Sequence, residues 1–244
     1  NYWIKQNKID AIYDKKLINN EEIKNIISQI KTGDISGINV TVPFKKLVIP
    51  YLEQLSPEAN ASQSVNTIYL EDKKIIGHNT DIAGFELGLR YHKYDVKNKK
   101  VLILGAGGVA PSIILGLKKM GASKIMLCNR TKSKAENLKK IYNDLDVVNW
   151  GDVPEFNMII NATSVGLKKN DEIEINLQNS GTNKFYYDLI YNPRETMFLK
   201  KAKAQGNIAK NGIMMFVYQA HQAFTIWHKM LPKIDEETLK LLNK

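Results

Sequence analysis

The sequence predicts an α/β protein of two domains, the second of them a doubly wound, Rossmann-type parallel sheet, with a cleft between the two. Two observations support this fold class. From Val101 onward, uniformly apolar strands alternate with helical segments, which is typical of a parallel sheet covered on both faces. Before that point the strands alternate apolar and polar residues and include a hairpin pattern, which indicates half-buried strands.

The first domain is expected at residues 1–83. Residues 1–8 have the pattern of a helix interior, so we expect the chain to have lost a leading segment. The other elements follow from apolar periodicity and from the positions of proline and glycine. They are a strand at 9–18, a helix at 21–33 that Gly33 ends, a strand at 37–41, a helix from Pro43 to about Leu55, the hairpin of VNTIYL and KKIIGHN, and a helix at 81–94.

The second domain is expected at residues 84–212, and residues 213–244 are expected to form helices that return to the first domain. Within it the sequence predicts a strand at 101–105, a helix that ends at Met120, a strand at 124–129, a helix at 132–142, and short strands near VVNW, MIINA and FYYDLI. A long helix begins at Ile213, and a short one follows Pro232.

Composition favours a reduced, cytoplasmic protein. The one cysteine, Cys128, excludes an internal disulfide and is expected to be a small buried residue. No apolar run is long enough to span a membrane, so no membrane association is expected. The four histidines lack the spacing of metal ligands, and no metal site is predicted.

The formal net charge of +10 is concentrated in one segment. Residues 97–140 carry eleven Lys or Arg and one acidic residue, Glu136, whereas the segments before and after it are each balanced. A field of this kind attracts anions, either a phosphorylated cofactor or a nucleic acid. The alternative is a solvated lysine-rich face, and residues such as Lys139 and Lys140 fit that description.

A glycine-rich turn follows the strand VLIL. Gly105, Gly107 and Ala110 match the pattern G-x-G-x-x-(G/A), in which the glycines allow a tight turn and close approach of a pyrophosphate to the backbone. The helix that follows offers its N-terminus to phosphate. The turn therefore predicts a dinucleotide site.

The end of the next strand indicates which dinucleotide. An NAD site requires an acidic residue there to hold the ribose 2′-hydroxyl, but this chain has Cys128, Asn129, Arg130 and Thr131. An arginine pairs instead with a 2′-phosphate, and Lys134 is close enough in sequence to assist. The sequence thus predicts NADP as cofactor and no nucleic-acid partner, since no aromatic residues are interleaved with the basic ones.

Polar residues gather in three short motifs of the first domain. They are Asn39, Thr41 and Lys45 in GINVTVPFK, Asn66 in VNT, and Asp81 in GHNTD. Taken singly, each is more often a solvated or helix-capping residue than a catalytic one. Together they suit a polyhydroxylated acid, because amides and hydroxyls match substrate hydroxyls without adding charge.

At these motifs the sequence resembles the NADP-dependent shikimate dehydrogenases. GINVTVPFK, VNT, GHNTD, GAGGVA, NRT, NATSVG, DLIYNP and GIMMFVYQAHQAF match that family in order, from Asp10 to about Trp227. The resemblance implies an oxidoreductase of the shikimate pathway, in aromatic amino-acid biosynthesis. Such an enzyme reversibly reduces 3-dehydroshikimate to shikimate with NADPH.

The resemblance also implies residue roles. Lys45 and Asp81 are the expected catalytic pair. The expected substrate contacts are Thr41, Asn66, Tyr191, Gln219 and, less strongly, Gln222. The expected cofactor contacts are Gly105, Ala106, Gly107, Gly108, Val109 and Ala110 at the pyrophosphate; Asn129, Arg130, Thr131 and Lys134 at the adenosine phosphate; and Thr163, Ser164, Leu189 and Gly212 at the nicotinamide.

Two departures from the family pattern leave alternatives open. The usual S-x-S-P stretch, which binds the substrate carboxylate, is not in the chain given, and Ile82 stands where glycine usually follows the catalytic aspartate. One alternative is therefore a quinate/shikimate dehydrogenase that uses NAD, and another is a non-catalytic nucleotide-binding relative. The expected partners are shikimate and 3-dehydroshikimate as small molecules, with the protein a monomer or a homodimer.

Overall fold

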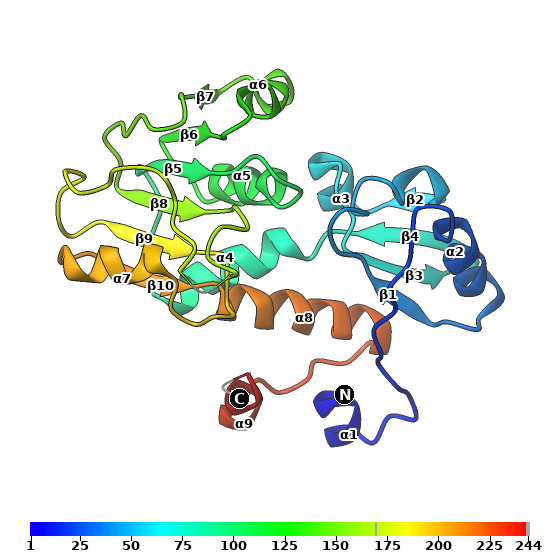
Figure 1. The fold of residues 1–244 in the computed structure, drawn as a ribbon. Helices are drawn as coiled ribbons and strands as arrows, with labels where there is room; N and C mark the ends of the chain where they lie inside the picture. Colours follow the sequence, from blue (N-terminus) through cyan, green and yellow to red (C-terminus); the bar gives the residue numbers. More distant parts are fainter. Residues whose placement is uncertain (169, 243–244) are drawn as a thin grey trace. The chain divides into compact units, whose positions relative to one another are not determined.

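The computed structural model describes residues 1–168 and 170–242, which form two compact units (Figure 1). Unit 1 comprises Asn1–Thr80 and Gln219–Lys244, and unit 2 comprises Asp81–Tyr218. The first segment of unit 1 ends at Thr80, three residues before the boundary expected at residue 83. Unit 2 ends at Tyr218, six residues after the boundary expected at residue 212. The return lies inside a single helix, α8 (Ile213–His228), where apolar periodicity carries no boundary signal.

Unit 2 contains the predicted parallel sheet. Its six strands have the order β10-β9-β8-β5-β6-β7, and every pair in it is parallel. The strands are β5 (Lys100–Leu104), β6 (Lys124–Cys128), β7 (Leu145–Val147), β8 (Met158–Asn161), β9 (Phe185–Asp188) and β10 (Ile208–Asn211). Because β5 is followed by β6 on one side and paired with β8 on the other, the chain reverses its direction of travel at β5, as in a doubly wound fold.

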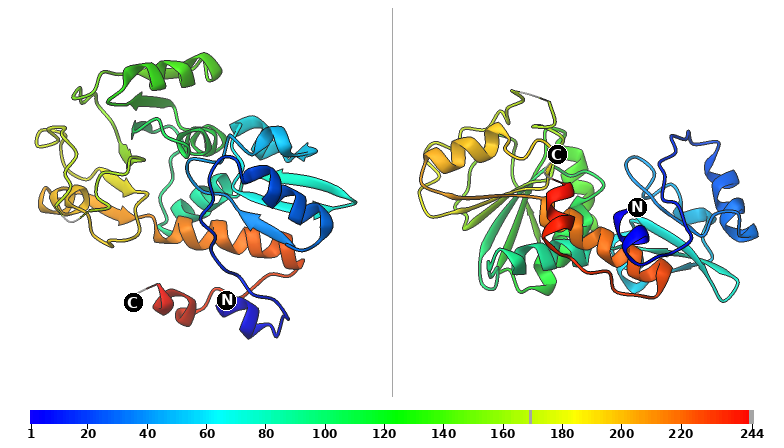
Figure 2. Two further views of the ribbon diagram at one scale, coloured as in Figure 1. Left: turned by 45° about the vertical axis from the view of Figure 1, so that its right-hand side comes forward. Right: turned by 90° about the horizontal axis from the view of Figure 1, so that it is seen from below.

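Helices and loops cover both faces of this sheet, as Figure 2 shows. The helices of unit 2 are α4 (Asp81–Tyr91), α5 (Ala110–Lys119), α6 (Lys132–Ile141), α7 (Met197–Ala204) and the first part of α8. Val101 and Ile103 of β5 pack with α4, α5 and α6, whereas Leu102 and Leu104 pack with α7 on the opposite face. The strand is therefore apolar at every position because both of its faces are buried. Helix α7 and strand β10 were not predicted.

Unit 1 is built on a mixed four-stranded sheet with the order β1-β3-β4-β2. Its strands are β1 (Gly37–Asn39), β2 (Gln54–Leu55), β3 (Thr67–Glu71) and β4 (Lys74–His78). The predicted hairpin is confirmed, since β3 and β4 pair antiparallel around Asp72 and Lys73. Its helices are α1 (Tyr2–Gln6), α2 (Ile23–Thr32), α3 (Pro57–Ser62), the second part of α8, α9 (Glu236–Leu241) and the 3₁₀ helix η1 (Ile49–Tyr51). Helix α2 ends at Gly33 with φ of 87°, as its sequence predicts.

Two predictions about unit 1 are wrong. Residues 9–18 form no strand, and Ile12 and Leu17 within them are 89% and 96% exposed, because among the described residues no neighbouring strand pairs with this segment. The helix expected from Pro43 to about Leu55 is a series of turns that leads into η1 and β2. The Val42–Pro43 peptide is cis, and the carbonyl of Lys45 accepts a hydrogen bond from the Val65 N–H at 2.8 Å instead of a helical one.

Within the described residues, no helix is both long and apolar enough to cross a bilayer. Cys128 is fully buried in β6, and burial raises the pKa of its thiol to about 12, so it is the inert apolar residue that was expected.

Candidate functional site

The glycine turn lies at the carboxyl end of β5, the central strand of unit 2. Gly105 has φ of +107°, and its N–H donates to the Cys128 carbonyl at 2.8 Å. A β-carbon at this position would lie 2.8 Å from Thr163 Cγ2 and 2.9 Å from the Ala162 carbonyl oxygen. Gly107 is open by comparison, since its nearest such neighbour is 3.9 Å away. The first glycine thus allows the turn and the packing, and the second leaves room for a ligand.

Helix α5 begins immediately after this turn. Its first turn contains Pro111 and no acidic residue, so the positive end of the helix dipole is not offset by a side-chain carboxylate. The six predicted residues from Gly105 to Ala110 lie together between β5 and this helix end. The arrangement suits a phosphate group.

Asn129 joins the glycine turn to the loop after β6. Its Oδ1 accepts the Ala106 N–H at 3.0 Å, and its Nδ2 donates to the Thr131 carbonyl at 2.8 Å. The carboxamide therefore holds two of the loops expected to bind the cofactor, rather than being free to reach a ligand with all of its polar atoms.

Part of the basic segment is paired with acids elsewhere in unit 2. Four of its eleven basic residues form ion pairs: Lys100 with Glu155 at 2.5 Å, Lys118 with Asp144 at 2.6 Å, Lys124 with Asp146 at 2.9 Å and Lys119 with Glu86 at 3.1 Å. Arg130 and Lys134 are exposed, and neither is in an ion pair among residues 1–168 and 170–242. Positive charge is therefore available to a ligand at the carboxyl end of β6, where the sequence predicts the 2′-phosphate.

The residues expected at the nicotinamide follow three neighbouring strands: Thr163 and Ser164 come after β8, Leu189 after β9 and Gly212 after β10. The Thr163 hydroxyl donates to Asn161 Oδ1 at 2.7 Å and accepts the Val165 N–H at 3.0 Å, so its hydrogen is used inside the loop. The Leu189 N–H donates to the Asn161 carbonyl at 3.0 Å. Gly212 packs so closely on Leu189 that a β-carbon would overlap the Leu189 backbone. Ser164, beside Thr163, is exposed.

Unit 1 brings three of its predicted residues together beside β3. Asn66 is 3% exposed, and its carboxamide binds Thr80 through both the Thr80 N–H, at 2.8 Å, and the Thr80 hydroxyl, at 3.0 Å. The Asn66 carbonyl accepts a hydrogen bond from the Val40 N–H at 2.8 Å, and Thr41 is the next residue along the chain after Val40. Lys45 is half-buried and is held by its carbonyl to Val65, the residue before Asn66. GINVTVPFK, VNT and the residues of GHNTD up to Thr80 therefore meet within unit 1, whereas Asp81 is the first residue of unit 2.

The other predicted residues lie on helices or next to them. Asp81 follows Thr80 as the first residue of α4 and is 6% exposed. Tyr191 stacks on Phe216 at 4.3 Å between ring centroids. Gln219 and Gln222, both half-buried, are three residues apart on α8 and so share a face of that helix.

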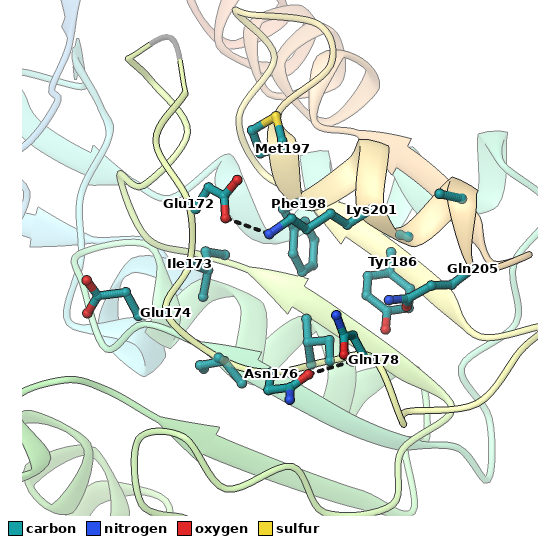
Figure 3. Close-up of a pocket in the computed structure, with 14 residues that line it drawn as sticks. Glu172, Ile173, Glu174, Asn176, Gln178, Tyr186, Met197, Phe198, Lys201 and Gln205 are labelled. Atoms are coloured by element: carbon teal, nitrogen blue, oxygen red, sulfur yellow. Dashed lines mark hydrogen bonds and ion pairs between the residues drawn. The ribbon is translucent and has the colours of Figure 1, made fainter.

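Unit 2 contains a cavity, drawn in Figure 3, that is lined by none of the predicted residues and has a volume of about 500 Å³. It lies between α7 and the segment 172–178, and its lining includes Phe198 and Tyr186. Of its charged groups, Lys201 pairs with Glu172 at 2.5 Å. We assign no ligand to it.

The chain matches two family models. The model described as the shikimate dehydrogenase substrate binding domain matches residues 1–68, and the one described as shikimate / quinate 5-dehydrogenase matches residues 86–201. A shikimate dehydrogenase (NADP(+)) from Pelagibacter ubique (strain HTCC1062) is 57% identical over 243 residues, covering 100% of this chain and 92% of that protein. The chain belongs to the shikimate dehydrogenase family.

Solved structures agree with this family membership. The crystal structure of shikimate dehydrogenase from Aquifex aeolicus is 37% identical with a TM-score of 0.89, covering 99% of this chain and 89% of that one. The 5-ketofructose reductase of Gluconobacter sp. strain CHM43, in its ligand-free form, is 31% identical with a TM-score of 0.86, covering 95% of this chain and 87% of that one. The family's two matched regions lie in unit 1 and unit 2 respectively.

Three buried polar residues next to the candidate site were not predicted from the sequence. Asn161, Asp188 and Thr196 are buried, and Asp188 accepts hydrogen bonds from the other two. The only signal for Asn161 and Asp188 was the match of NATSVG and DLIYNP to the family, which identifies segments and not contacts, and Thr196 lies outside both motifs.

Proposed function

We propose that this protein catalyses the reversible, NADPH-dependent reduction of 3-dehydroshikimate to shikimate. The observation that carries the proposal is the 57% identity, over the whole chain, to a protein named shikimate dehydrogenase (NADP(+)). In the reduction, the substrate carbonyl carbon gains a hydride and its oxygen gains a proton, and NADPH becomes NADP⁺. The chemistry that bound NADPH supplies is the hydride.

The residues present fit NADP. Gly105, Gly107 and the N-terminus of α5 would hold the pyrophosphate, since the turn is open at Gly107 and the helix end is positive. Arg130 and Lys134 would hold the 2′-phosphate, supported by their lack of ion-pair partners among the described residues. No acidic residue follows β6, so the NAD alternative has no group to hold a ribose 2′-hydroxyl there.

We assign the acid–base chemistry to Lys45 and Asp81. Reduction of a ketone develops negative charge on its oxygen, and an ammonium can supply both the opposing charge and the proton. Asp81 would orient the ammonium and accept a hydrogen bond from a substrate hydroxyl. Within unit 1, the Lys45 carbonyl is bound to the Val65 N–H and the Asn66 carboxamide to Thr80, so the backbone at Lys45 and the residue before Asp81 are both anchored.

Neutral polar groups would recognise the rest of the substrate. Thr41, Asn66, Tyr191, Gln219 and Gln222 carry hydroxyl or amide groups that match hydroxyls and a carboxylate. We also propose that the protein acts in the cytoplasm, because both reactants are small and water-soluble. The proposal further includes a monomer or a homodimer, and light scattering during gel filtration distinguishes these two oligomeric states.

The test is an activity assay with matched lysine variants. Formation of NADPH from NADP⁺, or of NADH from NAD⁺, is followed with shikimate and with quinate, and NADPH consumption is followed with 5-ketofructose. We expect shikimate with NADP⁺ to be used best. Lys45→Ala should lose about 10²–10⁴-fold in kcat, the range for general acid–base groups. Lys46→Ala, which changes the exposed neighbour, is the control and should keep its activity.

Four outcomes contradict the proposal. Full activity in Lys45→Ala would remove Lys45 from the mechanism, and better turnover with NAD⁺ would refute the role of Arg130. Turnover of 5-ketofructose alone would assign a different substrate. Binding of NADP⁺ without turnover of any substrate would favour a non-catalytic relative.

A further inference from the structure

A buried carboxylate lies at the end of β9, next to the expected nicotinamide site. Asp188 has no solvent-exposed surface, and its two oxygens accept three hydrogen bonds. The donors are the Thr196 hydroxyl at 2.5 Å, the Ile190 N–H at 3.0 Å and Asn161 Nδ2 at 3.0 Å. No basic side chain among the described residues offsets its charge. A buried carboxylate without a cation is costly, so its presence calls for a role.

One consequence of this carboxylate is the orientation of Asn161. A carboxylate only accepts hydrogen bonds, so Asn161 must turn its Nδ2 toward Asp188 and its Oδ1 away. The Oδ1 then accepts the Thr163 N–H at 3.1 Å and the Thr163 hydroxyl at 2.7 Å. Thr163 in turn contacts the glycine turn, where its Cγ2 would be 2.8 Å from a β-carbon on Gly105. The conformation of the loop after β8 therefore depends on which atom of Asn161 faces Asp188.

The same carboxylate holds the loop after β9. The Thr196 hydroxyl that donates to Asp188 also accepts the Leu199 N–H at 3.4 Å, as the N-cap of α7. The Thr196 methyl group packs on Gly166, where a β-carbon would be 2.9 Å away. With the bond to the Ile190 N–H, Asp188 connects residues 161–166 to residues 188–196. The Asn161 side chain joins the same two loops, since its Nδ2 donates both to the Val165 carbonyl at 3.1 Å and to Asp188.

The strand order assigns these two loops to one half of the dinucleotide. In a doubly wound sheet the cofactor lies across the carboxyl ends of the strands, with its pyrophosphate at the glycine turn. The adenosine half lies toward β6, where Arg130 and Lys134 are. The other half must extend over β8 and β9, on the opposite side of β5.

We propose that Asp188 is a positioning residue for the nicotinamide half of NADP, holding the loops after β8 and β9 in register through Asn161 and Thr196. The proposal rests on the proposed function, since it takes NADP as the ligand. Burial raises the pKa of Asp188 to about 6, against the lowering effect of its three hydrogen bonds, so the group is mainly ionised at pH 7.5 and able to accept all three.

The test compares a whole cofactor with its adenosine half. Calorimetric titration measures Kd for NADP⁺ and for adenosine 2′,5′-bisphosphate, which keeps the 2′-phosphate but has no nicotinamide. Asp188→Asn has nearly the same shape, but its NH₂ group must face one of the three donors, so Asn161 or Thr196 has to turn. We expect its Kd for NADP⁺ to rise about tenfold or more, with kcat reduced, and its Kd for the bisphosphate to stay within about twofold.

Two further variants complete the experiment. Asp146→Asn removes an exposed carboxylate paired with Lys124 at the far side of the sheet and should leave both Kd values within about twofold. Thr196→Val keeps the carboxylate and removes one donor, so it serves if Asp188→Asn does not fold, and it should show the same selective loss at a smaller size.

The outcomes separate the possible failures. Equal weakening of both ligands would mean that Asp188 only stabilises the fold, and unchanged binding of both would mean that it positions nothing; either result overturns the inference. Failure of the proposed function is detected separately, as absence of shikimate turnover by the unmodified protein.

Discussion

Replacing Thr196 by valine tests the buried network directly, because the two side chains differ mainly by one hydroxyl. That hydroxyl donates to the Asp188 carboxylate at 2.5 Å, and loss of a hydrogen bond to a buried charged group costs about 1.5–3 kcal/mol. It also caps α7, but the bond to the Leu199 N–H is long, at 3.4 Å, so the cap adds about 0.5 kcal/mol, the low end for N-caps. The expected loss of unfolding free energy is therefore about 2–3.5 kcal/mol, from these two contributions.

Thermal unfolding followed by circular dichroism measures this loss. For a chain of this size, 1 kcal/mol shifts Tm by about 2–4 °C, so Thr196→Val should unfold about 4–14 °C earlier. Thr196→Ser keeps the hydroxyl and loses only the methyl group packed on Gly166, which costs about 0.8 kcal/mol or about 2–3 °C. The reasoning is refuted if the serine variant is as unstable as the valine variant.

The dependence of this loss on pH gives a second check. Without the Thr196 hydroxyl, one of the hydrogen bonds that lower the pKa of Asp188 is gone, so that pKa rises further above 6. The valine variant should therefore be closest to the unmodified protein near pH 5, where Asp188 is protonated in both, and furthest from it near pH 8. A difference that does not change with pH would show that the hydroxyl does not act on the carboxylate.

Three further predictions concern unit 2. Arg130→Gln should raise KM for NADP⁺ by about 10–100-fold with little change for NAD⁺, because it would remove the bidentate contact proposed for the 2′-phosphate. Steady-state kinetics with both cofactors checks this, and equal effects on both would contradict it. Gly105→Ala should abolish cofactor binding by calorimetry, because φ is +107° and the β-carbon would meet Thr163 and the Ala162 carbonyl. Burial raises the pKa of Asp188 from 3.8 to about 6, so its stabilising contribution is full below about pH 4 and is lost as the pH rises through 6. Relative to Asp188→Asn, the unmodified protein should therefore lose about 3 kcal/mol of unfolding free energy between pH 4 and pH 7.5, measured by urea unfolding. A difference between the two proteins that stays constant with pH would contradict this assignment.

Much of unit 2 could be predicted because its signals are local. An apolar strand, a glycine turn and a helix that begins with Ala110 and Pro111 follow one another directly along the chain. Each of these elements depends on the periodicity or conformational preference of neighbouring residues. The position of Arg130 after the next strand is equally local, and the structure leaves that side chain exposed at the expected place.

Pairing between distant segments could not be predicted in the same way. Residues 9–18 alternate like a strand, but a strand also requires a partner edge, and among the described residues none pairs with them. The segment after Pro43 has helical composition, but the carbonyl of Lys45 bonds to Val65 rather than along a helix. In both cases, contacts with distant residues override the local conformational preference.

The parallel sheet, the glycine-rich turn, the preference for NADP and the family resemblance can be predicted from residues that adjoin one another along the chain. The contacts that connect the loops of the candidate site depend on the folded arrangement of distant residues. Asp188 binds Asn161, which lies 27 residues before it, and Thr196, which lies 8 residues after it. Contacts of this kind produce no periodic pattern in the sequence. The basic segment shows the same limit, since four of its lysines are neutralised by acids that lie far away in sequence or on other elements. Burial and charge compensation depend on distances in space, and adjacency in sequence does not report them.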